Sequence, residues 1–196
     1  MGFDIELSTK YVHLLLDGLY YGTIYIYTAP NADGPWTQAS TIDECYYDCG
    51  LLITDDGKMY VAYENSGISV AELSDDGLSE VSSQMVFHTD DAGYLKGSRF
   101  YQHDGSFYIF VVHPANKEHV LMSTSGVFSP YERRLLISDA GNPVSGAGYP
   151  HQGGIVDTPE WGLVLYSLCR CLSWRTNSRS RSFGLGKRWL AFGGVG

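Results

Sequence analysis

A repeat of 48 positions constrains the fold of this chain more than any other feature. The segment 56–61, D-G-K-M-Y-V, matches 104–109, D-G-S-F-Y-I, at that spacing. A weaker match relates 25–36 to 121–131 at twice the spacing. A repeat of about 50 residues with about four short strands is typical of a β-propeller blade. A β-sandwich is the alternative, but its strands do not usually repeat at this length.

Short β-prone segments separated by turn residues fill each repeat. The hairpin at 51–63 has an Asp-Asp-Gly turn at 55–57, and the Asp-Gly pairs at 56–57 and 104–105 are interpreted as the starts of units. Residues 12–16 fit either a strand or a helical turn. We therefore expect an all-β chain of about three blades, which cannot close a propeller ring alone. The other expected strands cover 19–21, 23–27, 67–73, 80–87, 107–112, 120–123 and 132–138.

Composition excludes some classes of partner. The net charge of −9 argues against nucleic acid, and no apolar run is long enough to span a membrane. Residues 1–10 lack the basic and apolar regions of a signal peptide.

Cys45 and Cys49 can form a disulfide only with favourable geometry, and no cysteine spacing is typical of zinc sites. The 15 tyrosines suit strands and also a surface that binds carbohydrate.

Three motifs follow one another at blade spacing. They are Y-D-C-G-L-L-I-T-D-D-G-K-M-Y-V-A-Y at 47–63, L-K-G-S-R-F-Y-Q-H-D-G-S-F-Y-I-F at 95–110 and G-Y-P-H-Q-G-G-I-V-D-T-P at 148–159. Together they resemble the second, third and fourth blade motifs of glycoside hydrolase family 43. The resemblance covers about 23–159 and implies an incomplete five-bladed β-propeller. It also implies a monomeric enzyme of the arabinofuranosidase or xylosidase type, which removes pentose units from plant polysaccharides with inversion.

The carboxylates of that family set the expectations for a catalytic site. An inverting glycosidase needs a carboxylate base and a protonated carboxyl acid, and the family adds a third carboxylate that raises the pKa of the acid. By resemblance, Asp48 is this pKa modulator, although an Asx-turn cap also fits its local sequence. Lys96 occupies the position of the acid, which is normally Glu. Asp4 and Asp17 do not match the D-P-type segment of the base, so the base is not assigned.

Three further residues are carried over or considered as ligand contacts. The resemblance places His151 at the propeller axis, as a substrate contact and as the ligand of a metal ion, with a calcium ion expected there and no cofactor required. The alternative for His151 is a buried histidine satisfied by backbone atoms. Tyr47 is a candidate for stacking on a sugar ring and Arg99 for contacting substrate, against strand packing and pairing with a nearby acid. Asp48, Lys96 and His151 are expected on one face, near the axis.

The chain changes character after Pro159. Residues 160–196 contain six of the 13 Lys and Arg residues and one of the 22 Asp and Glu residues. Suitable codons for this tail, read one nucleotide later, can spell N-G-D-W-Y-Y-I-A-F-V-D-A-Y-P-G-G-R-I-P-V-L-A-P, which resembles the rest of the fourth blade. We therefore divide the chain into a partial propeller, 1–159, and an irregular out-of-frame tail, 160–196, without a consistent strand pattern. An evolved basic tail is the alternative.

Two functions follow from these expectations. The first is a glycoside hydrolase by descent that acts on arabinose- or xylose-containing polysaccharides and is impaired in this form, because Lys96 is not a carboxyl acid and no base is assigned. The second is a non-catalytic carbohydrate-binding propeller fragment or interaction protein that uses Asp48, His151 and the tyrosines. Members of the family are usually secreted.

Overall fold

The described part of the chain consists of strands and turns. The computed structural model describes residues 4–14, 20–31, 33–64, 66–89, 93–113, 117–138, 147–158 and 162–171. In these residues no helix is long and apolar enough to cross a bilayer. The strands are β1 (Asp4–Leu14), β2 (Tyr20–Ala29), β3 (Thr37–Ile42), β4 (Tyr47–Ile53), β5 (Met59–Glu64), β6 (Gly67–Leu73), β7 (Glu80–His88), β8 (Lys96–His103), β9 (Ser106–His113), β10 (Lys117–Ser123), β11 (Glu132–Ser138), β12 (Ala147–Thr158) and β13 (Gly162–Cys171).

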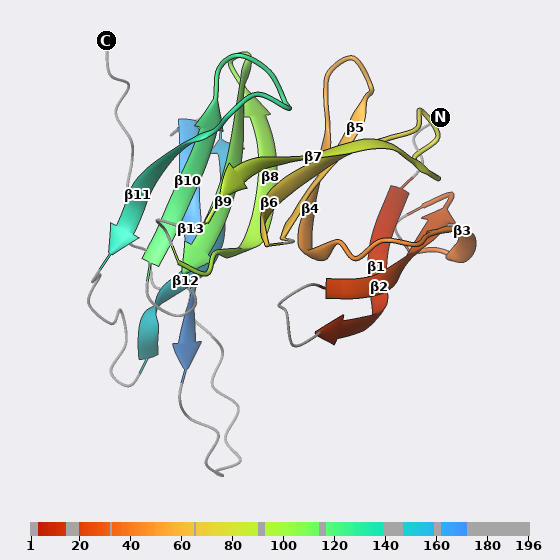
Figure 1. Ribbon diagram of the computed structural model, residues 1–196, viewed down its shortest axis with the longest axis horizontal. Helices are drawn as coiled ribbons and strands as arrows, with labels where there is room; N and C mark the ends of the chain where they lie inside the picture. Colours follow the sequence, from red (N-terminus) through yellow and green to blue (C-terminus); the bar gives the residue numbers. More distant parts are fainter. Residues whose placement is uncertain are drawn as a thin grey trace.

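Consecutive strands pair antiparallel into four sheets within these residues (Figure 1). The sheets are β1-β2-β3, β4-β5-β6-β7, β8-β9-β10-β11 and β12-β13. This arrangement confirms the prediction of an all-β chain built from blades. The predicted unit starts are wrong, however, because the turns at 55–57 and 104–105 join β4 to β5 and β8 to β9 inside a sheet.

Each sheet covers a face of the next one. Strand β5 is buried along its whole length, and its side chains alternate between the two faces. Met59, Val61 and Tyr63 pack toward the sheet β1-β2-β3, whereas Tyr60 and Ala62 pack toward the sheet β8-β9-β10-β11. Such two-sided burial is what a propeller blade between two neighbours requires. The hydrophobic cluster toward the sheet β1-β2-β3 also contains Ile24, Ile26, Ile42, Tyr46, Ala71 and Leu73.

The interface between the sheets β4-β5-β6-β7 and β8-β9-β10-β11 is the larger of the two. Its buried residues come from all four strands β4 to β7 and from the facing sheet. A smaller cluster around Phe110 and Val120 includes Ile155 of β12 and so joins the third sheet to the fourth. The sheets therefore pack in chain order. The large interface contains Leu52, Tyr60, Ala62, Ile68, Val70, Val86, Leu95, Phe100, Ile109, Val111, Leu121 and Tyr131.

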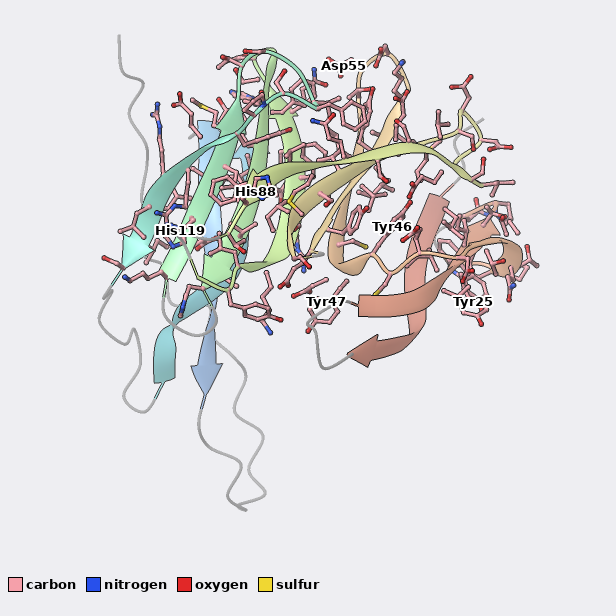
Figure 2. All side chains as sticks on the ribbon, in the orientation of Figure 1. Tyr25, Tyr46, Tyr47, Asp55, His88 and His119 are labelled. Carbon is pink, nitrogen blue, oxygen red and sulfur yellow. The ribbon has the colours of Figure 1, made fainter. Side chains whose placement is uncertain are left out.

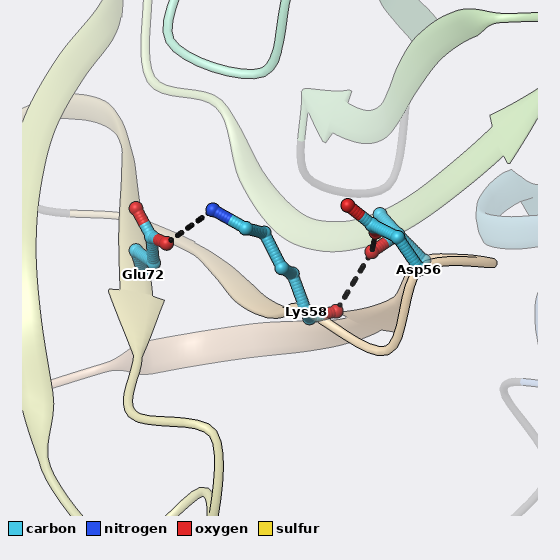
Figure 3. A network of polar contacts seen from close by, with 4 residues as sticks. Asp56, Lys58 and Glu72 are labelled. Atoms are coloured by element: carbon cyan, nitrogen blue, oxygen red, sulfur yellow. Dashed lines mark hydrogen bonds and ion pairs between the residues drawn. The ribbon is translucent and has the colours of Figure 1, made fainter.

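The turn between β4 and β5 confirms that Asp55 and Asp56 are turn residues. The Thr54 hydroxyl donates to Asp56 Oδ1 at 2.5 Å, and its oxygen lies 3.0 Å from the Lys58 carbonyl oxygen. Lys58 Nζ lies 3.2 Å from Glu72 Oε1 of β6 (Figure 3). Because this ion pair is exposed, water screens it and it contributes little to stability.

The ends of the described chain differ from expectation. The ambiguous segment 12–16 lies partly in β1, which pairs along β2. The prediction that residues 160–196 lack strand structure is wrong for β13, which pairs with β12 through Cys171. The run G-L-V-L-Y-S-L is rich in β-prone residues, and pairing with β12 satisfies backbone groups of both strands. Residues 172–196 lie outside the described residues, and the out-of-frame origin of the tail stays a prediction.

Tyr46 connects its hydrophobic cluster to a charged group. Its side chain is 1% exposed, and its hydroxyl donates to Glu80 Oε2 at 2.6 Å. Hydrogen bonds to charged groups contribute more than neutral ones, so we expect Tyr46→Phe to lower the free energy of unfolding by about 1.5 kcal/mol. Urea unfolding measures this change, with the partly exposed Tyr27→Phe on β2 as the control. An equal effect of the two substitutions would contradict the assignment.

Candidate functional site

A β-bulge interrupts β4 at the predicted site. The pairing with β5 moves from Tyr47 opposite Glu64 to Gly50 opposite Ala62, so β4 has one extra residue. Asp48 lies in this bulge with a φ of 51°, a left-handed conformation that residues with a side chain rarely adopt. Asp48 is therefore inside the strand, not before it as its sequence context suggests. Bulges often redirect side chains next to active sites.

The same irregularity recurs in β8. Its pairing with β9 moves from Lys96 opposite Val112 to Arg99 opposite Phe110. Gly97 has a φ of 79° and occupies the place that Asp48 has in β4. The repeat thus extends to the irregular part of each blade, and it places Asp48 and Lys96 at the starts of the first strands of neighbouring sheets.

Strands β4 and β8 approach each other closely at these bulges. A Cβ atom on Gly50 would overlap the Ser98 carbonyl oxygen and lie 3.0 Å from Arg99 Cα. The Arg99 guanidinium donates to the Cys49 carbonyl oxygen at 3.3 Å and to that of Ser98 at 3.1 Å. The bond to Cys49 connects the two sheets, whereas the bond to Ser98 lies within β8. A contact between Arg99 and substrate stays a prediction.

Glu64 is the residue of this site that sequence reasoning missed. It is the last residue of β5, lies opposite Tyr47 and is 4% exposed. Burial and the Asp48 carboxylate raise its pKa to about 7, while the Lys96 ammonium and a hydrogen bond with Tyr94 act in the opposite direction. Asp48 and Lys96 therefore both lie close enough to act on the same buried carboxyl group.

The signal for Glu64 in the sequence is a charge at the end of an apolar strand. The run M-Y-V-A-Y-E places it directly after five residues that are all buried in the structure. A glutamate at a strand end is normally solvent-exposed. Only the packing of β8 against β4 and β5 reveals that this one is buried.

Tyr47 lies at the end of β4 that is opposite the turn. Figure 2 shows Tyr47 and Asp55 at opposite ends of this strand. The side chain of Tyr47 is partly buried. The candidate site therefore lies on the side of the sheet where β4 and β8 begin, and stacking of Tyr47 on a sugar ring stays a prediction.

The contacts described above test neither the role of His151 nor the calcium ion predicted near it. The backbone of His151 pairs with Leu168 in the sheet β12-β13, and its side chain lies outside the described residues. Its position on one face with Asp48 and Lys96 therefore stays a prediction. The described residues contain no group of three or more His, Cys, Asp or Glu that could hold a metal ion. The calcium ion near His151 also stays a prediction.

Cys45 lies just before β4 and Cys49 lies within the bulge, and both are free thiols. Burial is the main cause that raises the pKa of both groups, that of Cys49 to about 11. A thiol with such a pKa is a poor nucleophile near neutral pH. Neither cysteine therefore adds a nucleophilic group to the candidate site.

Comparisons with known proteins agree on one family. The model of glycosyl hydrolases family 43 matches residues 13–184. Xylosidase/arabinosidase 43B of Humicola insolens is 22% identical over 191 residues, which cover 85% of this chain and 36% of that protein. The chain thus spans about a third of the length of this relative.

Solved structures of the family have the same fold. A GH43 glycoside hydrolase engineered to display both endo-xylanase and exo-arabinofuranosidase activity is 38% identical, with a TM-score of 0.68. The match covers 80% of this chain and 34% of that one. The GH43_1 enzyme of Xanthomonas citri, solved with xylotriose, is 18% identical with a TM-score of 0.59, and the match covers 80% and 57% of the two chains.

Proposed function

Because the chain belongs to glycosyl hydrolases family 43, we propose that its site binds the pentose units of arabinose- or xylose-containing oligosaccharides. The observation that carries this proposal is the group formed by Asp48, Glu64 and Lys96 where β4, β5 and β8 meet. Carboxyl and ammonium groups hydrogen-bond sugar hydroxyls, and a few such groups fix the orientation of a ligand. The xylotriose bound by the Xanthomonas citri enzyme supports this class of ligand.

The same group of residues argues for weak hydrolysis. Family chemistry needs a protonated carboxyl at position 96, and this chain has Lys96 there. An ammonium group is a much weaker acid than a protonated carboxyl group, so it is a poor general acid near neutral pH. Asp48 raises the pKa of a carboxyl group, as a modulator should, but that carboxyl belongs to Glu64. Binding without efficient turnover is therefore the activity that we propose for this chain.

Titration with xylotriose and with 1,5-linked arabinotriose tests the binding proposal. We expect calorimetry to detect at least one of them, and Asp48→Asn to weaken that affinity about tenfold, because a hydrogen bond to a charged group is lost. Asp55→Asn, at the opposite end of β4, is the matched control and should bind like the unmodified chain. Failure of both sugars to bind, or equal binding by the two variants, would refute the proposal.

Hydrolysis is expected to stay below detection in the unmodified chain and in Lys96→Glu. A positioned acid or base contributes about 10²–10⁴-fold to the rate, and a glutamate at position 96 would add a third carboxyl group beside Asp48 and Glu64. Pentose release from aryl xylosides and aryl arabinosides measures the activity. Clear turnover by the unmodified chain that disappears in Asp48→Ala would show that the catalytic groups are misplaced.

A further inference from the structure

We propose that Glu64 is a further ligand-binding residue, which in its protonated form donates a hydrogen bond from Oε2 to a glycosidic or ring oxygen of the bound pentose. This inference rests on the proposed function, because it names a contact within the same site. It goes further in one respect, since it assigns a role to a residue outside the motif positions that carry family chemistry.

The position of Glu64 supports this role. It ends β5, between Tyr47 of β4 and Ile68 of β6, at the edge where β8 brings in Lys96. Within the described residues its Oε2 is buried and has no hydrogen-bond partner. A buried polar atom without a partner is uncommon in native proteins and calls for an explanation. A ligand oxygen that accepts a hydrogen bond would supply the partner.

Burial is the main cause that favours a proton on Glu64, and the charges around it act in both directions. Strand β4 contributes the Asp48 carboxylate, and Ile68, its partner in β6, is uncharged. Lys96 of β8 and the hydroxyl of Tyr94, just before β8, favour the ionised form. The balance with burial holds the pKa near 7, so the protonated form dominates below neutral pH. Ring and glycosidic oxygens can only accept hydrogen bonds, so only this form of Glu64 can bond to them.

Xylotriose affinity as a function of pH tests the assignment. Calorimetric titrations of the unmodified chain between pH 5.5 and 8.5 should show binding that weakens about tenfold, with a midpoint near 7 in the free protein. Glu64→Gln should bind with nearly constant affinity over this range, because its amide donates at every pH. The exposed-pair variant Glu72→Gln is the control and should follow the unmodified chain.

The carboxyl signal of Glu64, followed by carbon NMR in the unmodified chain, gives a second measurement that needs no variant. Its pKa should rise when xylotriose is added, because the ligand binds the protonated form. Xylotriose binding that is independent of pH, or stronger at high pH, would overturn the role of Glu64 and leave the proposed function intact. Absence of xylotriose binding at every pH would overturn the inference, and absence of arabinotriose binding as well would refute the proposed function.

Discussion

Gly50→Ala is expected to lower the free energy of unfolding by about 3 kcal/mol, at the upper end of the cost of overpacking. The added methyl group would meet backbone atoms of β8: the Ser98 carbonyl oxygen, Arg99 Cα and, at 3.1 Å, the Phe100 nitrogen. Backbone atoms within a paired strand cannot rotate away as the end of a side chain can. Relief would require β4 and β8 to separate, which would break the bond from Arg99 to the Cys49 carbonyl oxygen.

Urea unfolding measures this cost, and Gly57→Ala supplies the matched control. Gly57 has a φ of 83° but no atom within 4 Å of an added Cβ, so its substitution costs only the backbone strain of about 1 kcal/mol. The two variants thus separate steric overlap from conformational strain. Equal destabilisation by both would mean that β4 and β8 are not in close contact. Xylotriose binding should also be lost in Gly50→Ala, because the contact positions Asp48 and Lys96.

Glu64→Gln is expected to make the protein more stable above pH 7, by up to about 3 kcal/mol. The carboxyl group has an ordinary pKa of 4.5 and a pKa of about 7 in the folded protein. Below pH 4.5 it is protonated in both states and costs nothing. As the pH rises from 4.5 to 7 the unfolded state releases its proton first, so folding stability falls. Glutamine does not ionise and avoids this loss.

His119 has the opposite effect on how stability depends on pH. It is 5% exposed, and burial, Arg133, Lys117 and His113 lower its pKa from 6.5 to about 4. Its contribution to stability is therefore complete above pH 6.5 and is lost as the pH falls toward 4. Between about 4.5 and 6.5 the two groups compensate each other. The summed contribution of Glu64 and His119 to the free energy of unfolding should therefore be nearly constant over this range.

Urea unfolding at several pH values tests this compensation. Glu64→Gln should become steadily more stable from pH 4.5 to 6.5, whereas His119→Gln should become less stable over the same range. The slopes have opposite signs because one group binds more protons in the folded state and the other binds fewer. Two variants with parallel curves would contradict the environments assigned to Glu64 and His119.

Three of the four strands of the second sheet could be predicted from sequence almost to the residue, whereas β4 begins at Tyr47, before the hairpin expected from residue 51. The expected 59–63, 67–73 and 80–87 became Met59–Glu64, Gly67–Leu73 and Glu80–His88. Their boundaries are marked by turn residues, and β-branched and aromatic residues fill them. The start of each unit was misjudged because a repeat has no defined origin. The predicted hairpin at 51–63 is confirmed by the pairing of β4 with β5, and this pairing also shows that its turn does not start a new unit.

Only residues within a family motif could be predicted as members of the candidate site, and their catalytic roles stay predictions. Asp48 and Lys96 were named through the resemblance, and the structure places both near one carboxyl group. Glu64 was missed because its burial arises from β8, more than 30 positions along the chain. The backbone bonds of Arg99 could not be predicted either, since a side chain that contacts carbonyl groups leaves no complementary charge in the sequence.

The bulges in β4 and β8 divide each strand into a part that packs in the core and a part that carries residues of the candidate site. In both strands the regular alternation of side chains resumes beyond the bulge. Leu52 and Phe100 lie in this regular part and fill the shared core, so substitutions there are limited by the volume available in the core. Within the bulge, Asp48 and Gly97 stand outside that alternation. A substitution before or within the bulge, such as a lysine at position 96, therefore leaves this core unchanged, whereas Gly50 at the end of the bulge is limited by the backbone of β8. A blade of this kind can lose or exchange its chemistry while its fold persists.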